Sequence, residues 1–183
     1  MARLPYLDKQ DLKPEHQHLL KRNINLLRLM SHSPLGATAF HGMGHYIRFE
    51  SPLNTRLREM AILQIGYSTR SVYEYTHHIK ISREFGVSDE DIRAIAEETA
   101  GRTSNLDPLT RHVLRAAREI THDLTTTDET FAALKSHLDE ECLTDLVLII
   151  SFYNAVVRFL STMQVDNEPE YQVLLADFPF API

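Results

Sequence analysis

A glutamate and a histidine four positions apart, Glu74 and His78, form a pair whose spacing suits chemistry. If the segment Ser71–Phe85 is helical, this spacing places both side chains on one face, where they can touch. In a partly buried pair the carboxylate favours the protonated imidazole, whereas burial opposes charge on either group. Such a pair is suited to proton transfer near neutral pH. His78 is expected at the edge of the core, and the neighbouring His77 is expected to face water.

A second acidic residue, Glu59, lies in the segment Thr55–Ser68, which is apolar on nearly every side of a helix. Such a helix is typical of the centre of a bundle, so the Glu59 carboxylate should be buried or face a cleft. A buried carboxylate needs a partner. We expect either His78, on the next antiparallel helix, or Arg56, three positions earlier. An ion pair between Glu59 and Arg56 would have only a structural role. The same holds for Glu74 and His78 if they form a pair on the helix surface.

Two further histidines, His41 and His45, are also four positions apart and flank Gly42 and Gly44. This spacing can hold zinc if a third ligand is present, but the sequence has neither an HExxH pattern nor a nearby cysteine pair. We therefore predict no metal and favour a structural role for the pair, with His45 as a candidate substrate-binding residue. The glycines would let the backbone approach a pocket.

Polar residues interrupt the most apolar helix expected in the chain, at Ser151, Asn154, Arg158 and Ser161. Arg158 could bind a substrate carboxylate or pair with Glu59. It could equally pack its stem at a subunit interface, which is the reading we favour.

Composition limits the possible functions. The 183 residues carry a net charge of −6, and no cluster of Lys and Arg suggests nucleic acid as a partner. The single cysteine, Cys142, excludes an intramolecular disulfide and a CxxC pair and suits a reducing compartment. The N-terminus lacks an apolar signal segment, and charged residues interrupt the apolar stretch Leu143–Leu160. We therefore expect a cytoplasmic protein with no membrane partner.

The pattern of caps and breaks predicts an all-α fold of about eight helices in one domain spanning residues 1–183. Ser88 with Asp91 and Asp107 with Pro108 are helix-start signals, and Gly86 is a stop signal. A proline-broken apolar tail, residues 167–183, is expected to lie across the domain or a neighbouring subunit. The expected helices are Pro14–Met30, Leu35–Phe49, Thr55–Ser68, Ser71–Phe85, Ser88 to Gly101, one opened by Asp107 and Pro108, one from Thr126 to about Leu138, and Glu141–Met163.

Three segments together resemble the core signature of the carboxymuconolactone decarboxylase and alkylhydroperoxidase D family. They are residues 56–63 (RLREMAIL), 73–78 (YEYTHH) and 85–92 (FGVSDEDI), so the resemblance is specific over residues 56–92. In the hydroperoxidase branch, a glutamate is followed by CxxC and then a histidine four residues on. By spacing, Glu59 matches that glutamate and His78 that histidine. The two cysteines fall on Ser71 and Glu74, so the chain resembles the branch that lacks them.

This resemblance implies an all-α helical-hairpin bundle of the alkylhydroperoxidase D type, which forms homo-oligomers, trimers or hexamers. It also implies decarboxylase-type chemistry without metal or organic cofactor, acting on a small cyclic or aromatic-derived carboxylic acid. His78 would donate or shuttle a proton, and Glu59 or Glu74 would orient it. Tyr73 and Tyr75 are candidate wall residues or hydroxyl donors, although projection turns Tyr73 toward solvent or a neighbouring subunit. Ser71, Arg158 and His45 complete the expected substrate-binding set.

Two other functions remain open. A peroxidase-like oxidoreductase is disfavoured because thiol-based peroxide reduction needs a reactive thiolate and usually a second thiol, which Ser71 and Glu74 cannot supply. A non-catalytic module that binds a small molecule would keep the fold without the chemistry.

Overall fold

The computed structural model describes residues 1–181, which form α-helices and short 3₁₀ helices and no strand. The 3₁₀ helices are η1 (Lys9–Asp11), η2 (Pro14–Leu20) and η3 (Val173–Ala176). The α-helices are α1 (Asn25–Met30), α2 (Pro34–Phe49), α3 (Thr55–Ser68), α4 (Val72–Glu84), α5 (Asp89–Thr99), α6 (Pro108–Asp123), α7 (Asp128–Lys135), α8 (Glu140–Met163) and α9 (Pro169–Gln172). The predicted all-α class is confirmed.

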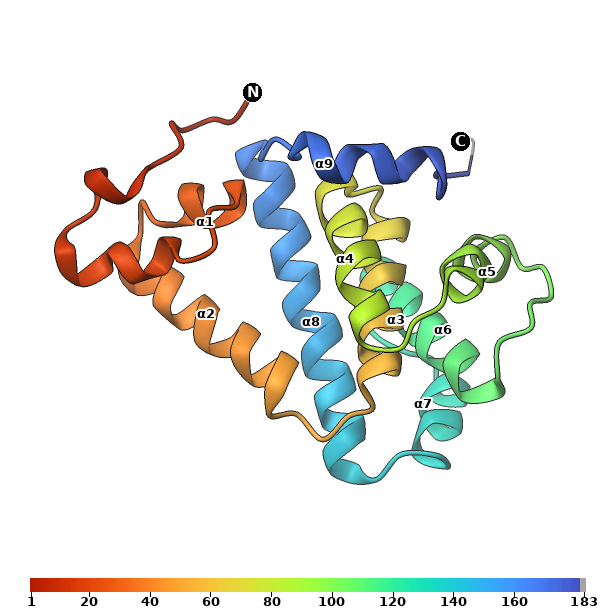
Figure 1. The fold of residues 1–183 in the computed structure, drawn as a ribbon. Helices are drawn as coiled ribbons and strands as arrows, with labels where there is room; N and C mark the ends of the chain where they lie inside the picture. Colours follow the sequence, from red (N-terminus) through yellow and green to blue (C-terminus); the bar gives the residue numbers. More distant parts are fainter. Residues whose placement is uncertain (182–183) are drawn as a thin grey trace.

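Helix α3 is the centre of the bundle, as its apolar circumference predicts. Every residue from Leu57 to Tyr67 is buried, and the helix packs against α4, α5, α6 and α8 (Figure 1). Asn54 caps it by accepting hydrogen bonds from the backbone N–H groups of Arg56 and Leu57. Because α3 is surrounded by other helices, the backbone of Glu59 has a fixed position in the interior.

The close approach of α3 and α4 depends on Gly66. A Cβ atom at this position would lie 2.9 Å from the backbone nitrogen of Tyr75, which is a steric clash. Glycine, which has no Cβ, avoids this clash. Arg70 makes the tight connection between the two helices with a left-handed backbone, φ 53°. The two helices that carry Glu59 and His78 are therefore in near-backbone contact at one end.

Helix α8 forms much of the remaining core. Its buried residues include Leu146, Ile149 and Ile150, which pack in the same cluster as α3 and α6 residues. Within residues 1–181, α8 is the one helix long and apolar enough to cross a membrane by length and composition, a test that core helices of soluble proteins also pass. Its place in the bundle agrees with the prediction of a buried helix.

The helix-start signals are confirmed, and one predicted helix is wrong. Ser88 and Asp91 form a reciprocal capping box at α5, and Asp107 caps α6 ahead of Pro108. The expected helix Pro14–Met30 is instead two pieces, η2 and α1. The first backbone N–H of α1, from Asn25, donates a hydrogen bond to the carboxylate of Glu168 at 2.7 Å. This distant residue therefore stabilises the N-terminus of α1.

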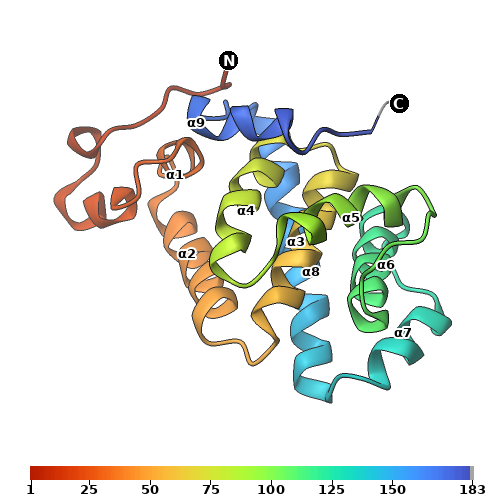
Figure 2. The ribbon, with the colours of Figure 1, turned by 45° about the vertical axis from the view of Figure 1, so that its right-hand side comes forward.

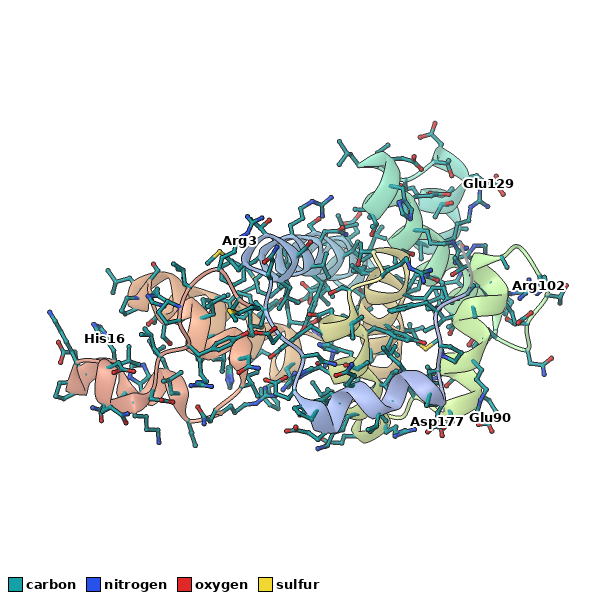
Figure 3. All side chains as sticks on the ribbon, turned by 90° about the horizontal axis from the view of Figure 1, so that it is seen from above. Arg3, His16, Glu90, Arg102, Glu129 and Asp177 are labelled. Carbon is teal, nitrogen blue, oxygen red and sulfur yellow. The ribbon has the colours of Figure 1, made fainter. Side chains whose placement is uncertain are left out.

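The C-terminal segment crosses the bundle over α4, as Figures 1 and 2 both show. Phe180 packs on Tyr67 and Tyr75, and the ring of Phe178 faces the guanidinium of Arg93 from α5. In Figure 3, Asp177 at the end of η3 lies on the α5 side of the molecule. The predicted tail therefore packs on its own chain. The last two tail positions, 182 and 183, lie outside the described residues.

Candidate active site

The Glu59 carboxylate and the His78 imidazole are in direct contact in the interior. Oε2 of Glu59 lies 2.7 Å from Nδ1 of His78, and the two residues are 1% and 5% exposed. They come from α3 and α4, whose separation Gly66 sets. The predicted contact across the two antiparallel helices is confirmed. The hydrogen bond fixes the orientation of the imidazole and turns Nε2 away from Glu59.

Glu59 is also held by an arginine that sequence reasoning missed. Arg58 is 1% exposed, and its Nε donates to Oε1 of Glu59 at 3.0 Å. Its Nη1 donates to the backbone oxygens of Ile47 and Arg48, and its guanidinium lies 4.4 Å above the ring of Phe85. Helical projection places consecutive residues about 100° apart, so it gave no signal for this pair.

The alternative partner for Glu59, Arg56, lies elsewhere. Its Nε donates to a carboxylate oxygen of Asp91 at 3.0 Å, and it also reaches Asp107 at the start of α6. The expectation that Arg56 holds Glu59 is therefore wrong. Arg56 instead ties α3 to the first turns of α5 and α6.

The second nitrogen of His78 faces Glu74. Nε2 lies 3.1 Å from Oε1 of Glu74, an ion-pair distance that lacks the alignment of a hydrogen bond. Glu74 is 4% exposed, and its Oε1 has no hydrogen-bond partner within residues 1–181. Glu74 lies in the first turn of α4, where the helix dipole favours negative charge. A buried carboxylate oxygen that lacks a donor is a candidate contact for a ligand.

The electrostatics favour a protonated His78. Burial opposes its positive charge, but Glu59 and Glu74 outweigh burial and raise the pKa of His78 to about 9. Burial alone would raise the pKa of Glu59, yet His78 and Arg58 hold it below its usual value. With both carboxylates ionised, the two cations and two anions of this cluster balance. His78 is thus a proton donor at neutral pH rather than a group near its titration midpoint.

Tyr153 of α8 is another residue that sequence reasoning missed. Its ring meets the His78 imidazole edge-on, with centroids 5.2 Å apart. Burial, together with the charges of Glu74 and Glu59, raises the pKa of Tyr153, so the phenol stays neutral. Its hydroxyl makes no hydrogen bond to any residue that the structure describes. Tyr153 can therefore donate a hydrogen bond to a molecule beside His78.

A cavity of about 640 Å³ opens onto this cluster. His78, Glu74 and Tyr153 border it from α4 and α8. The opposite wall comes from α2 and from the segment between η2 and α1, which lie on the outer side of α8 in Figure 1. A cavity of this size suits a small molecule, and its mixture of apolar walls with a few convergent polar groups is typical of ligand sites.

The sequence model of the carboxymuconolactone decarboxylase family matches residues 34–119, which include Glu59, Glu74 and His78. Over that stretch the chain is therefore similar to this family. Its structure has the fold of several solved proteins at low identity, while the comparison with curated protein sequences gives no match.

One such structure is the debrominase Bmp8, as a variant in complex with 2,3,4-tribromopyrrole, with TM-score 0.81 and 19% identity over 97% of this chain and 100% of that one. Another is an uncharacterized peroxidase-related protein with an alkylhydroperoxidase core from Ralstonia eutropha JMP134, with TM-score 0.76 and 20% identity over 94% and 95% of the two chains. A third, from Silicibacter sp. TM1040, is also peroxidase-related, with TM-score 0.74 and 20% identity over 93% and 92%. At this identity they establish the fold alone.

The expectation that His77 faces water is wrong. His77 is 4% exposed because its ring is stacked between Tyr73, at 4.1 Å, and Tyr171, at 3.7 Å. Its Nε2 lies 2.8 Å from Oε2 of Glu168. Tyr171 and Glu168 both belong to the C-terminal segment, about 90 residues later in the sequence. A helical projection of α4 cannot reveal such distant contacts.

The two candidate tyrosines have different surroundings. Tyr73, expected toward solvent or a neighbouring subunit, is 5% exposed within its own chain and borders the cavity. Its hydroxyl accepts a hydrogen bond from the backbone N–H of Leu26 at 3.2 Å. Tyr75 borders neither cavity, because its ring packs against Tyr67 and Phe180. The structure therefore brings Tyr73, and not Tyr75, to the cavity.

Two other predicted substrate-binding residues, Ser71 and Arg158, border a different cavity of about 650 Å³, which shares Tyr73 with the first. Nη1 of Arg158 donates to the backbone and side-chain oxygens of Asn154, at 2.7 and 2.8 Å. Arg158 is therefore turned toward its own helix, and the suggested pair with Glu59 is wrong.

His45 borders the first cavity, as does His41. Nε2 of His45 lies 3.3 Å from a carboxylate oxygen of Glu50 at the exposed end of α2. Among the residues described, no three His, Cys, Asp or Glu side chains are arranged to hold a metal ion, so the zinc alternative lacks its third ligand.

Proposed function

We propose that this protein is a cofactor-free acid–base enzyme of carboxy-lyase type, acting on a small cyclic or aromatic-derived carboxylic acid. One observation carries the proposal. His78 is held through Nδ1 by Glu59, is kept protonated, and turns Nε2 toward Glu74 beside a cavity of small-molecule size. Perturbed ionisable groups at a cavity are a physical mark of active sites.

The chemistry follows from these positions. When the bond between ring carbon and carboxylate breaks, its electron pair passes into a conjugated ring carbonyl and carbon dioxide leaves. The resulting enolate oxygen is stabilised by a donor such as the neutral Tyr153 phenol. His78 then gives its Nε2 proton to the ring carbon and is reprotonated from water, with Glu74 stabilising the imidazolium. The products are carbon dioxide and a ring in which a C–H bond has replaced the carboxylate.

Glu59 and Arg58 are positioning residues in this scheme. Glu59 fixes the ring of His78 through Nδ1, and Arg58 adds to the effect of His78 in holding the pKa of Glu59 below its usual value. Neither borders the cavity. They act through His78, in the way that outer carboxylates orient catalytic histidines.

A thiol peroxidase is less well supported. Cys142 lies in the first turn of α8 and borders neither cavity. Burial and the nearby Asp139 raise the pKa of the Cys142 thiol, which disfavours the thiolate that peroxide reduction requires. Peroxide reduction that is lost in Cys142→Ser would overturn this assignment.

The debrominase relative supports a ring-shaped occupant for the cavity, because that protein was crystallised with a brominated pyrrole. A small planar ring suits a cavity of about 640 Å³. Reductive removal of bromine needs an electron donor, and no thiol is among the side chains that border the cavity in residues 1–181. A carboxylated ring is therefore the better match for the acid–base groups present.

The test is incorporation of solvent deuterium. Unsaturated lactones with a ring carboxylate are incubated with the protein in D₂O, and carbon dioxide release and C–D formation are followed by NMR. We expect His78→Gln to reduce turnover by roughly 10² or more, because positioned proton donors contribute about 10²–10⁴-fold. Arg158→Gln, in the other cavity, is the control and should keep full activity. Turnover that survives in His78→Gln, or a lack of turnover across the whole set, contradicts the proposal.

A further inference from the structure

The side chains that border the His78 cavity carry a strong excess of positive charge. Lys21, Arg22 and Arg48 border it, against the single carboxylate of Glu74. The whole chain has the opposite sign, with a net charge of −6. A cleft whose charge opposes that of its protein concentrates ligands of the complementary sign, here anions.

These cations lack acidic partners. Lys21, Arg22 and Arg48 form no ion pair with any residue in the described part of the chain, although Asp and Glu outnumber Lys and Arg, 25 to 19. By contrast, Arg56 and Arg58, close by in sequence, each hold a carboxylate. An arginine fork that faces a cavity without a carboxylate is positioned to accept one from a ligand.

Arg48 is the cation best placed for this role. It is half-buried, and it shares one face of α2 with His41 and His45, at spacings of seven and three residues. Gly44 lies on the same wall, and a Cβ atom there would meet nothing within 4 Å, so the backbone leaves the cavity open at this point. The charge of Arg48 also acts on the Tyr153 hydroxyl, opposing the rise in the pKa of that phenol. Arg48 and Tyr153 therefore face the same space from α2 and α8.

We infer that Arg48 is the specificity-determining residue of this cavity: it binds a carboxylate of the substrate and directs the rest of the ring toward His78, while Lys21 and Arg22 attract the anion to the entrance. This inference rests on the proposed function only for the identity of the reacting end. The bound class is a small planar ring bearing a carboxylate, held by the guanidinium at the α2 wall.

The test compares two ring probes of the same size, furan-2-carboxylate and furan-2-carboxamide, by calorimetry in a phosphate-free buffer of low ionic strength. We expect the wild-type protein to prefer the carboxylate. Arg48→Gln should weaken carboxylate binding about 10- to 100-fold, the usual effect of losing a charged hydrogen bond. Carboxamide binding should be unchanged, which also shows that the variant is folded. Arg48→Lys keeps the charge but not the fork, and should bind with intermediate affinity.

Arg158→Gln is the matched control, because Arg158 borders the other cavity, and it should bind both probes as the wild type does. Equal binding of the two probes by wild type, including no binding of either, overturns the inference, as does carboxylate affinity unaffected in Arg48→Gln. A preference for carboxylate without turnover leaves the anion site standing and removes the proposed reaction. Turnover in D₂O, combined with carboxylate binding that is unchanged in Arg48→Gln, supports the proposed reaction and removes the anion site.

Discussion

At the scale of residues, the site contains four buried ionisable side chains that pair with one another. Arg58 and His78 are the cations, and Glu59 and Glu74 are the anions, all at most 5% exposed. Burying four charges is costly unless each is paired, and loss of one partner leaves the others uncompensated. The cluster therefore tolerates substitution poorly, even at Arg58, which does not border the cavity.

Arg58→Leu tests this cost. The substitution leaves two buried carboxylates against one imidazolium, and we expect it to lower the free energy of unfolding by about 3–5 kcal/mol. The neighbouring Arg56→Leu is the control. Because Arg56 pairs near the surface, at 28% exposure, its loss should cost about 1 kcal/mol or less. Urea denaturation of both variants gives the measurement, and equal losses would contradict the assignment of Arg58 to the buried cluster.

At the scale of elements, two contacts set the geometry of the site. Gly66 lets α3 and α4 approach until Glu59 reaches His78. The C-terminal segment covers α4 from outside, where Glu168 bonds His77 and also the start of α1. Helix α4 is therefore held on one side by the core and on the other by the end of the chain, with adjacent histidines bound to different carboxylates.

Gly66→Ala tests the first contact. The added methyl would meet backbone at 2.9 Å, so we expect the helices to separate and stability to fall by about 1–3 kcal/mol. Gly42→Ala is a matched control within α2, where a Cβ meets nothing within 4 Å. That variant should be unchanged or stabilised by roughly 0.5–1 kcal/mol. Thermal melts compare the two, and a stable Gly66→Ala protein would show that the close approach is not required.

At the scale of the whole molecule, the charged cluster links stability to pH. The pKa of His78 is raised from 6.5 to about 9 in the folded protein, so its contribution is complete below about pH 6.5 and is lost as pH rises through 9. Glu59, whose pKa is lowered from 4.5, contributes above that value and loses its contribution in acid. For this pair, stability should be greatest between about pH 4.5 and 6.5.

We therefore expect the free energy of unfolding to fall by on the order of 3 kcal/mol between pH 6.5 and 9. Urea denaturation at a series of pH values measures this slope. His78→Gln, although less stable overall, should show a much flatter profile over the same range. A wild-type profile that is flat from pH 6.5 to 9 would mean that the His78 pKa is not raised.

Sequence reasoning placed most of the helices, because these follow from local periodicity. It named His78 as one of two candidate partners of Glu59, and the resemblance of three segments indicated the family. It missed Arg58 because the pair with Glu59 joins adjacent positions that a projection separates. It misplaced His77 because Glu168 and Tyr171 cover that residue from the far end of the chain. The homo-oligomer, the cytoplasmic location and the absence of a cofactor stay predictions.

The wall formed by Lys21 and Arg22 precedes position 34, where the family match begins. The acid–base residues lie inside the matched stretch, whereas part of the entrance lies outside it. Proteins that inherit the same reactive groups can thus diverge in what they admit by altering only their leading residues. Exchange of residues 1–33 between relatives would therefore alter the cations at the entrance while keeping Arg48 and the proton-transfer residues in place.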